Sequence, residues 1–188
     1  MSIIVSISKG GRSVMAADSL VTLGDRRIPT ASLAVQKIRQ VGEALVALAG
    51  WNVYDDVLTD YLTSRRGVRL KTRTEVFAFF NEFWKALHKD YAFVNDSVEA
   101  SDSPFGSLDS TFLVQNASGI FVVTSDMGVL PFDRFYAIGS GAPYSLGALE
   151  AIYDSELDAE AIARQAVDIA IRLDTSCDGP VSVREVPA

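Results

Sequence analysis

Residues 2–19 read SIIVSISKGGRSVMAADS, and this stretch decides how the chain begins to fold. Two runs rich in β-branched and small residues flank Lys9-Gly10-Gly11-Arg12. Glycine adopts the positive φ angles of tight hairpin turns, so the stretch predicts a β-hairpin that is followed by Asp18. A second hairpin is predicted over Lys37–Val41 and Ala44–Ala49, which two turn residues separate. Antiparallel sheet is therefore expected in the first part of the chain.

Outward from these two hairpins, the hydrophobic period changes after Gly50. Apolar residues recur at three- and four-residue spacing from Val53 to Leu62, and an aromatic face runs from Val76 to Leu87 after a helix start at Thr74. Both patterns predict helices. The other predicted elements are a loop with one short strand over Asp18–Thr30, a surface loop over Asn95–Ser110, a hairpin over Thr111–Gln115 and Ile120–Thr124, a strand over Phe135–Ile138, a helix from Pro143 to Ile152, a helix from its cap Asp158 to Leu173, and a strand over Val181–Val186.

The order of these elements is strands, two helices, strands, two helices and a strand. A doubly wound parallel sheet needs a regular alternation of strands and helices, which this order lacks. It favours an α+β fold, a four-layer αββα sandwich in which two antiparallel sheets pack together and a pair of helices covers each outer face. The length of 188 residues predicts one domain, over residues 2–188.

The composition of the chain argues against several classes of binding partner. The net charge is −7 and the pI about 4.7, which argues against a nucleic-acid-binding protein. No apolar run approaches the ~18 residues that cross a bilayer, and no signal peptide opens the chain, so we expect no membrane association. The chain has one cysteine, Cys177, and one histidine, His88. It therefore cannot form an internal disulfide or supply the usual ligand set of a structural zinc site. We therefore expect a cytoplasmic protein with no metal and no cofactor.

The chemistry suggested by the sequence begins at Ser2. The familiar catalytic motifs, such as GxSxG, the Walker loop and HExxH, are absent. A small residue after Met1 permits removal of that methionine, which would leave Ser2 with both a hydroxyl and a free α-amine. An α-amine has a pKa of ~7.7–8.0, whereas a lysine has a pKa of ~10.4. At neutral pH a larger fraction of the α-amine is therefore unprotonated and able to accept a proton. Nucleophile and base would then belong to one residue.

Further motifs extend this hypothesis over essentially the whole chain. They are Ser2–Ile7 with the Gly-Gly turn, Val14–Ser19, Val35–Ile38, Ala47–Gly50, Tyr136–Tyr144 with its Gly-Ser-Gly turn, and Asp174–Gly179. Together they resemble the proteasome β-subunit family of N-terminal nucleophile hydrolases, and among its members the small bacterial proteasome-like peptidases. The resemblance implies the four-layer fold of that family.

The resemblance also implies a role for each matching residue. Ser2 stands where the family usually has a threonine nucleophile, and its hydroxyl would attack a peptide carbonyl. Lys37 would lie beside that hydroxyl, where its charge favours the alkoxide or where it accepts the proton itself. Asp18 would pair with Lys37, because two such groups in a cleft are tolerable together and costly apart. The N–H of Gly50 would point at the developing oxyanion.

A second set of matching residues would support the terminal amine of Ser2. Ser140 and Asp174 would hold that amine toward the hydroxyl. Cys177 stands where the family commonly has a serine, and a thiol is a weaker hydrogen-bond donor than a hydroxyl. This departure weakens the last hydrogen bond that the resemblance implies.

Three further residues would bind the substrate. The backbone of Thr22 would pair with an extended peptide, while Val35 and Leu48 would line the pocket for the side chain that precedes the cut. The resemblance thus implies a threonine-type endopeptidase with an N-terminal serine nucleophile. It would assemble with itself into a ring, act on peptides or unfolded proteins, and have an ATP-driven unfoldase as a candidate partner.

Two alternatives use the same fold. The first is a non-catalytic assembly subunit that retains Met1. The second is an amidase or transpeptidase that uses Ser2 on a small substrate. The state of the N-terminus separates the first from an enzyme, and a substrate profile separates the second from a protease.

Overall fold

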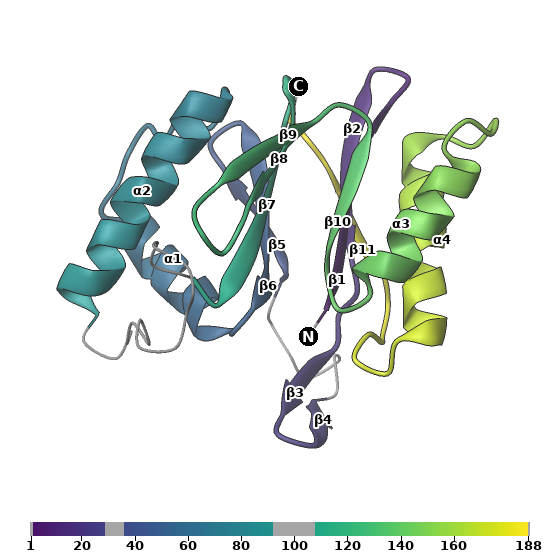
Figure 1. Cartoon of the computed structure of the whole chain (residues 1–188), viewed down its shortest axis with the longest axis horizontal. Helices are drawn as coiled ribbons and strands as arrows, with labels where there is room; N and C mark the ends of the chain where they lie inside the picture. The colour runs from purple at the N-terminus through teal and green to yellow at the C-terminus, as the bar shows by residue number, and fades with distance from the viewer. Residues whose placement is uncertain (1, 29–35, 92–107, 188) are drawn as a thin grey trace.

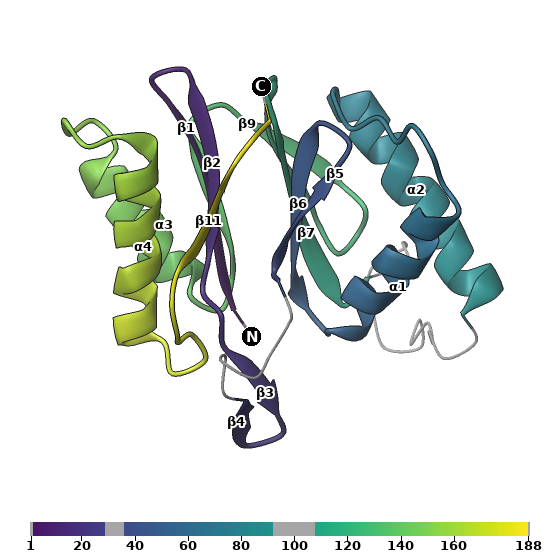
Figure 2. The same cartoon turned by 180° about the vertical axis from the view of Figure 1, so that it is seen from behind.

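The computed structural model describes residues 2–28, 36–91 and 108–187. Two antiparallel sheets form its middle layers and two pairs of helices cover their outer faces (Figures 1 and 2). The first sheet has the order β10 (Phe135–Gly139), β1 (Ile3–Lys9), β2 (Arg12–Ala17) and β11 (Ser182–Glu185). The second sheet has the order β5 (Ile38–Val41), β6 (Ala44–Gly50), β7 (Ser110–Asn116), β8 (Gly119–Val123) and β9 (Val129–Phe132). The αββα arrangement expected from the sequence is confirmed.

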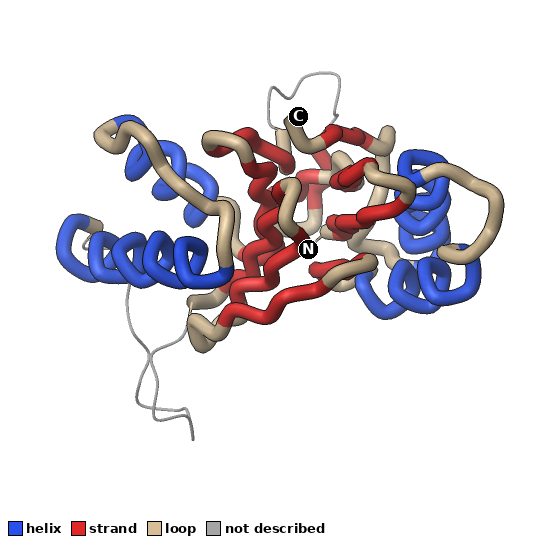
Figure 3. The backbone as a smooth tube through the Cα atoms, turned by 90° about the horizontal axis from the view of Figure 1, so that it is seen from above, coloured by secondary structure: helices blue, strands red, loops and turns tan. Residues whose placement is uncertain are grey.

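The helices form the two outer layers. α1 (Val53–Thr63) and α2 (Arg73–Asp90) cover the second sheet, and α3 (Ala142–Ile152) and α4 (Ala159–Leu173) cover the first. Viewed from above, the strands lie between the two helix groups (Figure 3). Among the described residues, none of the helices combines the length and the apolarity that a bilayer crossing requires.

Three apolar clusters hold the layers together. Alternate residues of β1 face opposite sides, as a strand requires: Ile3 and Val5 pack toward α3 and α4, whereas Ile4 packs between the sheets. Met15 and Leu113 join Ile4 in that central cluster. Because both faces of β1 are buried, it reads in the sequence as an almost continuous apolar run.

The predicted hairpins are confirmed. β1 pairs with β2 in a register that sets Lys9 opposite Arg12, and both Gly10 and Gly11 have positive φ angles, 59° and 78°. β5 pairs with β6, and β7 with β8.

The structure corrects several element boundaries. The stretch after Asp18 holds two short strands, β3 (Val21–Leu23) and β4 (Arg26–Ile28), where one was predicted. Strand β9 was not predicted. Helix α2 is capped by Thr72, which accepts a hydrogen bond from the Glu75 N–H, so the predicted start at Thr74 was wrong by two residues. Most of the predicted loop over Asn95–Ser110 lies outside the described residues.

Candidate active site

Four of the predicted site residues come from matching strand ends. Ser2 precedes β1, Asp18 follows β2, Lys37 precedes β5, and Gly50 ends β6. In an antiparallel hairpin the start of the first strand and the end of the second lie at the same end of the sheet. The two hairpins stack with these strand ends at the same end of the sandwich (Figure 1). The four residues therefore lie at that end.

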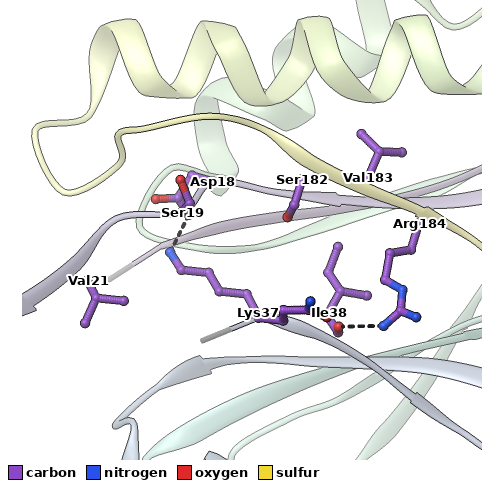
Figure 4. A pocket seen from close by; sticks show the side chains of 9 residues that line it. Asp18, Ser19, Val21, Lys37, Ile38, Ser182, Val183 and Arg184 are labelled. Atoms are coloured by element: carbon purple, nitrogen blue, oxygen red, sulfur yellow. Dashed lines mark hydrogen bonds and ion pairs between the residues drawn. The ribbon is translucent and has the colours of Figure 1, made fainter. Parts of the chain in front are cut away.

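A lysine joins the two sheets at this end. The Lys37 Nζ donates to Ser2 Oγ at 3.0 Å and to Asp18 Oδ1 at 2.7 Å. Its side chain extends to the carboxylate of Asp18, as Figure 4 shows. The Lys37 side chain is 12% exposed and the Asp18 side chain is fully buried. The ammonium is therefore held against the hydroxyl of Ser2 by a carboxylate that itself cannot move freely.

Backbone N–H groups fix the Asp18 carboxylate. It accepts hydrogen bonds from the N–H of Ile3 at 3.0 Å, of Leu20 at 3.2 Å and of Asp178 at 3.3 Å. With Lys37 these donors satisfy both carboxylate oxygens, which a buried carboxylate requires. Asp18 thus ties the start of β1 to the turn that follows α4.

Burial changes the proton affinity of Lys37. Removal from water disfavours the ammonium and lowers the pKa of Lys37 below its ordinary value, and the charge and hydrogen bond of Asp18 offset only part of this effect. Lys37 therefore exchanges a proton with a neighbouring hydroxyl more readily than an exposed lysine does.

Two glycines at this end of the sandwich allow neighbouring backbone segments to approach closely. Gly50 has a φ of 151°, and a Cβ there would lie 2.6 Å from the Asp109 carbonyl oxygen. Gly139 has a φ of 102°, and a Cβ there would lie 2.8 Å from the carbonyl carbon of Ser2. Real Cβ atoms do not tolerate such contacts, so both positions require glycine.

The turns that carry Ser140 and Asp174 meet behind Ser2. The Gly141 N–H donates to the Ser2 carbonyl at 3.4 Å. Asp174 accepts from the Ser176 N–H at 2.9 Å and from the Cys177 Sγ at 3.5 Å. The Cys177 thiol, a weak donor, thus donates to the carboxylate of Asp174.

Burial acts on both partners in this turn. It opposes ionisation of Asp174, but hydrogen bonding to the carboxylate, which includes the Ser176 N–H and the Cys177 thiol, outweighs it and holds the pKa of Asp174 below its ordinary value. Burial raises the pKa of Cys177 to about 12, with the negative charges of Asp18 and Asp174 adding to the shift. The thiol therefore stays protonated at neutral pH and serves as a donor, not as a nucleophile.

The predicted substrate-binding residues are only partly described. Thr22 is exposed on β3, opposite Arg27 of β4. Leu48 is half-buried and packs against the core beneath α1 and α2. Val35 lies outside the described residues. The predicted substrate-binding pocket therefore falls partly outside the described residues and stays a prediction.

Sequence reasoning missed Asp178. Its N–H donates to Asp18, its carbonyl accepts from the Ser19 N–H at 3.1 Å, and its carboxylate pairs with Arg27. The signal was present, since Asp178 lies within Asp174–Gly179, one of the stretches that carry the resemblance. Among the described residues, no three histidine, cysteine, aspartate or glutamate side chains gather in a way that could hold a metal.

Comparison with known proteins finds relatives over nearly the full length. No family model matches the chain. It is 30% identical over 174 residues to the ATP-dependent protease subunit HslV of Bartonella quintana, covering 90% of this chain and 81% of that protein. It is also 30% identical over 187 residues to the ATP-dependent protease subunit HslV of Roseobacter denitrificans, covering 98% and 93%.

Solved structures agree. The structure of Thiobacillus denitrificans BPH in complex with epoxomicin superposes with a TM-score of 0.87 at 32% identity, covering 99% of this chain and 100% of that one. The eukaryotic HslV of Trypanosoma brucei superposes with a TM-score of 0.67 at 24% identity, covering 97% and 98%, and this likeness concerns the fold alone.

Proposed function

The chain belongs to the proteasome β-subunit superfamily of N-terminal nucleophile hydrolases, and from this premise we propose that it is a threonine-type endopeptidase that uses the N-terminal serine Ser2. The observation that carries the proposal is the contact of Lys37 Nζ with both Ser2 Oγ and Asp18 Oδ1. A buried ammonium held beside a hydroxyl stabilises the alkoxide that forms when the hydroxyl loses its proton.

The first chemical step forms an acyl-enzyme. Hydrolysis of the peptide bond before Ser2 frees its α-amine, which accepts the hydroxyl proton as Oγ attacks the substrate carbonyl. The carbonyl oxygen becomes an oxyanion, to which the Gly50 N–H donates. When the tetrahedral intermediate collapses, the C–N bond breaks and the amine of Ser2 returns the proton to the leaving nitrogen. An ester on Ser2 remains.

Water completes the cycle. The α-amine of Ser2 takes a proton from a water molecule, which attacks the ester, and the proton then returns to Oγ as the acid product leaves. Ser140 and Asp174 position the amine for both transfers, and Cys177 supports Asp174. Serine lacks the methyl group that restricts χ1 in threonine, so its hydroxyl is less firmly oriented.

Substrate binding involves Thr22, Val35 and Leu48. The backbone of Thr22 pairs with an extended peptide, and the two apolar side chains favour an apolar residue before the scissile bond. The preference is modest, because one methylene changes discrimination by only ~1–3 kcal/mol. Fluorogenic peptides that are cleaved best after Arg or Asp would contradict this assignment.

Assembly and location complete the proposal. Residues 2–188 form one domain of a cytoplasmic homo-oligomeric ring, and an ATP-driven unfoldase supplies it with unfolded protein. The relatives named as ATP-dependent protease subunits support an assembly of several subunits and an ATP-driven partner. Head-to-tail contacts between copies close into a ring when the rotations between successive copies add up to a full turn. Native mass spectrometry that detects only a monomer near 20 kDa at micromolar concentration would contradict the ring.

One pair of variants tests the catalytic proposal. Ser2→Ala removes the nucleophile, so peptide hydrolysis should be lost while the fold is kept. Ser6→Ala is the matched control, because Ser6 is buried on β1 and its hydroxyl has no hydrogen-bond partner among the described residues. Undiminished hydrolysis in Ser2→Ala, or equal loss in both variants, would favour the non-catalytic assembly subunit. Turnover of small amides but not of peptides would favour the amidase.

A further inference from the structure

An open cavity of about 570 Å³ borders the site on the side away from Lys37. It is lined by Ala49, Gly50, Trp51, Thr111, Gly139 and Ser140. None of these side chains is charged. Trp51 is 67% exposed, which is unusual for so large an apolar side chain placed directly after the glycine of the site.

Strand order determines which part of a substrate reaches this cavity. In the first sheet, β1 lies between β2 and β10, so Ser2 has Asp18 on one side and Gly139 on the other. In the second sheet, β6 lies between β5, which Lys37 precedes, and β7, where Thr111 pairs with Ala49 and Ser110 with Gly50. The nucleophile therefore separates the ion pair from the cavity.

A peptide that crosses the site passes from one side to the other. Thr22, on the strand that follows β2, belongs to the side of Asp18 and Lys37. If its backbone pairs with the residues before the cut, the residues after the cut leave past Gly139 and Ser140 into the cavity. Ser140, which the proposed function sets beside the amine of Ser2, lines this same cavity.

We propose that Trp51 determines specificity for the substrate residue that follows the scissile bond and that it favours aromatic and large apolar side chains. This inference rests on the proposed peptidase function. The exposed indole offers a flat apolar surface on which an aromatic ring packs, and the uncharged lining provides no partner for a charged side chain. An acidic or basic residue after the cut is therefore disfavoured.

The test compares two internally quenched peptides that differ only in the residue after the cleaved bond, Phe or Gly. The wild-type ring should prefer the Phe peptide, and Trp51→Ala should reduce the ratio of the two kcat/KM values about 3- to 10-fold. Trp51→Leu should give an intermediate ratio. Phe77→Ala is the matched control, since Phe77 is also an exposed aromatic residue (49%) but lies on α2, away from the site. An unchanged ratio in Trp51→Ala, or an equal change in Phe77→Ala, would overturn the proposal.

A binding measurement separates this proposal from the peptidase function. The chain has two tryptophans, so Trp84→Phe leaves Trp51 as the sole indole. Titration with product peptides that begin with Phe or Gly should shift the Trp51 fluorescence at lower concentrations of the Phe peptide. Equal affinity for both peptides would overturn the role of Trp51 even if the enzyme cleaves peptides. Tighter binding of the Phe peptide without turnover would support the site and contradict the peptidase function.

Discussion

The two helix layers pack on their sheets with different side chains. The layer formed by α1 and α2 is aromatic: Phe80 and Phe83 both pack on Phe112 of β7, with ring centroids 4.8 and 6.0 Å away. The layer formed by α3 and α4 contains small residues, among them Ala163 and Ala166, which pack against β1 and β2. Large rings fill the space above the second sheet, whereas alanines let α4 approach the first sheet closely.

The two layers therefore contribute differently to the stability of the fold and to the geometry of the site. The first sheet carries Ser2 and Asp18 at its strand ends, and a Cβ added at Gly141 would already lie 2.9 Å from Ala170 and 3.0 Å from Ile3. Little space remains for adjustment in this layer. We therefore expect changes in the alanine layer to alter activity and stability together, and changes in the aromatic layer to alter mainly stability.

The largest effect is expected at Gly139. Gly139→Ala sets a Cβ against the backbone of Ser2 in a region of positive φ, so Ser2 must shift. A displacement of about 1 Å at a reacting group costs roughly 100-fold in rate, and kcat/KM should fall by at least that factor. Gly147→Ala is the control, because a Cβ on this helical residue meets no atom within 4 Å. Its activity should be unchanged, and a Gly139→Ala enzyme of normal activity would refute the close approach.

The aromatic layer should respond differently. Phe83→Ala leaves a cavity beside Phe112 and should lower the free energy of unfolding by ~3–5 kcal/mol, measured by urea denaturation. The kcat of the remaining folded enzyme should stay within about twofold of wild type, since Phe83 packs in the apolar cluster between the second sheet and its helices. A large fall in kcat with unchanged stability would contradict the division between the layers.

A larger side chain in the alanine layer should lower both stability and activity. Ala166→Leu adds volume between α4 and β1 and should lower the free energy of unfolding by ~1–3 kcal/mol. It should also reduce kcat, because β1 carries Ser2. Ala151→Leu, on the exposed face of α3, should change neither quantity. If Ala166→Leu destabilises the protein and leaves kcat at the wild-type value, α4 does not position the site.

The smallest expected effect concerns pH. Because burial lowers the pKa of Lys37 in the folded protein, the unfolded chain binds one more proton between that lowered value and the ordinary value of 10.5. The free energy of unfolding should therefore rise with pH across this window. In Lys37→Met that rise should vanish, although the variant is less stable at every pH because Asp18 loses its partner. Parallel pH profiles for the two proteins would show that Lys37 does not titrate as described.

Much of the fold could be predicted because the hairpins and helices have strong local signals. The gathering of Ser2, Asp18 and Lys37 followed from their positions at strand ends together with the family resemblance. Strand β9 could not be predicted, since it has four residues and one is Pro131, which weakens any strand pattern. The cap at Thr72 was missed because Thr74 is equally suitable locally, and only the reciprocal bond with Glu75 decides between them.

The contacts of Asp178 show what local patterns omit. Its N–H reaches Asp18, 160 positions away in the sequence, and its carboxylate pairs with Arg27 on β4. Neither Asp178 nor Arg27 stands in a stretch with a clear hydrophobic period. Their pairing depends on how the turn after α4 meets the β3–β4 hairpin. Tertiary packing alone creates this contact.

Whether Ser2 supplies both the nucleophile and the base is tested most directly by the intact mass of the purified protein before and after reaction with a peptide ester at low pH. We expect a mass without Met1, and an added acyl group that proteolytic mapping locates on the peptide beginning at Ser2. An amide nitrogen has its lone pair delocalised into the carbonyl and cannot serve as the base, so the free amine is essential. Peptide hydrolysis by protein that quantitatively retains Met1 would show that the α-amine of Ser2 is not the catalytic base.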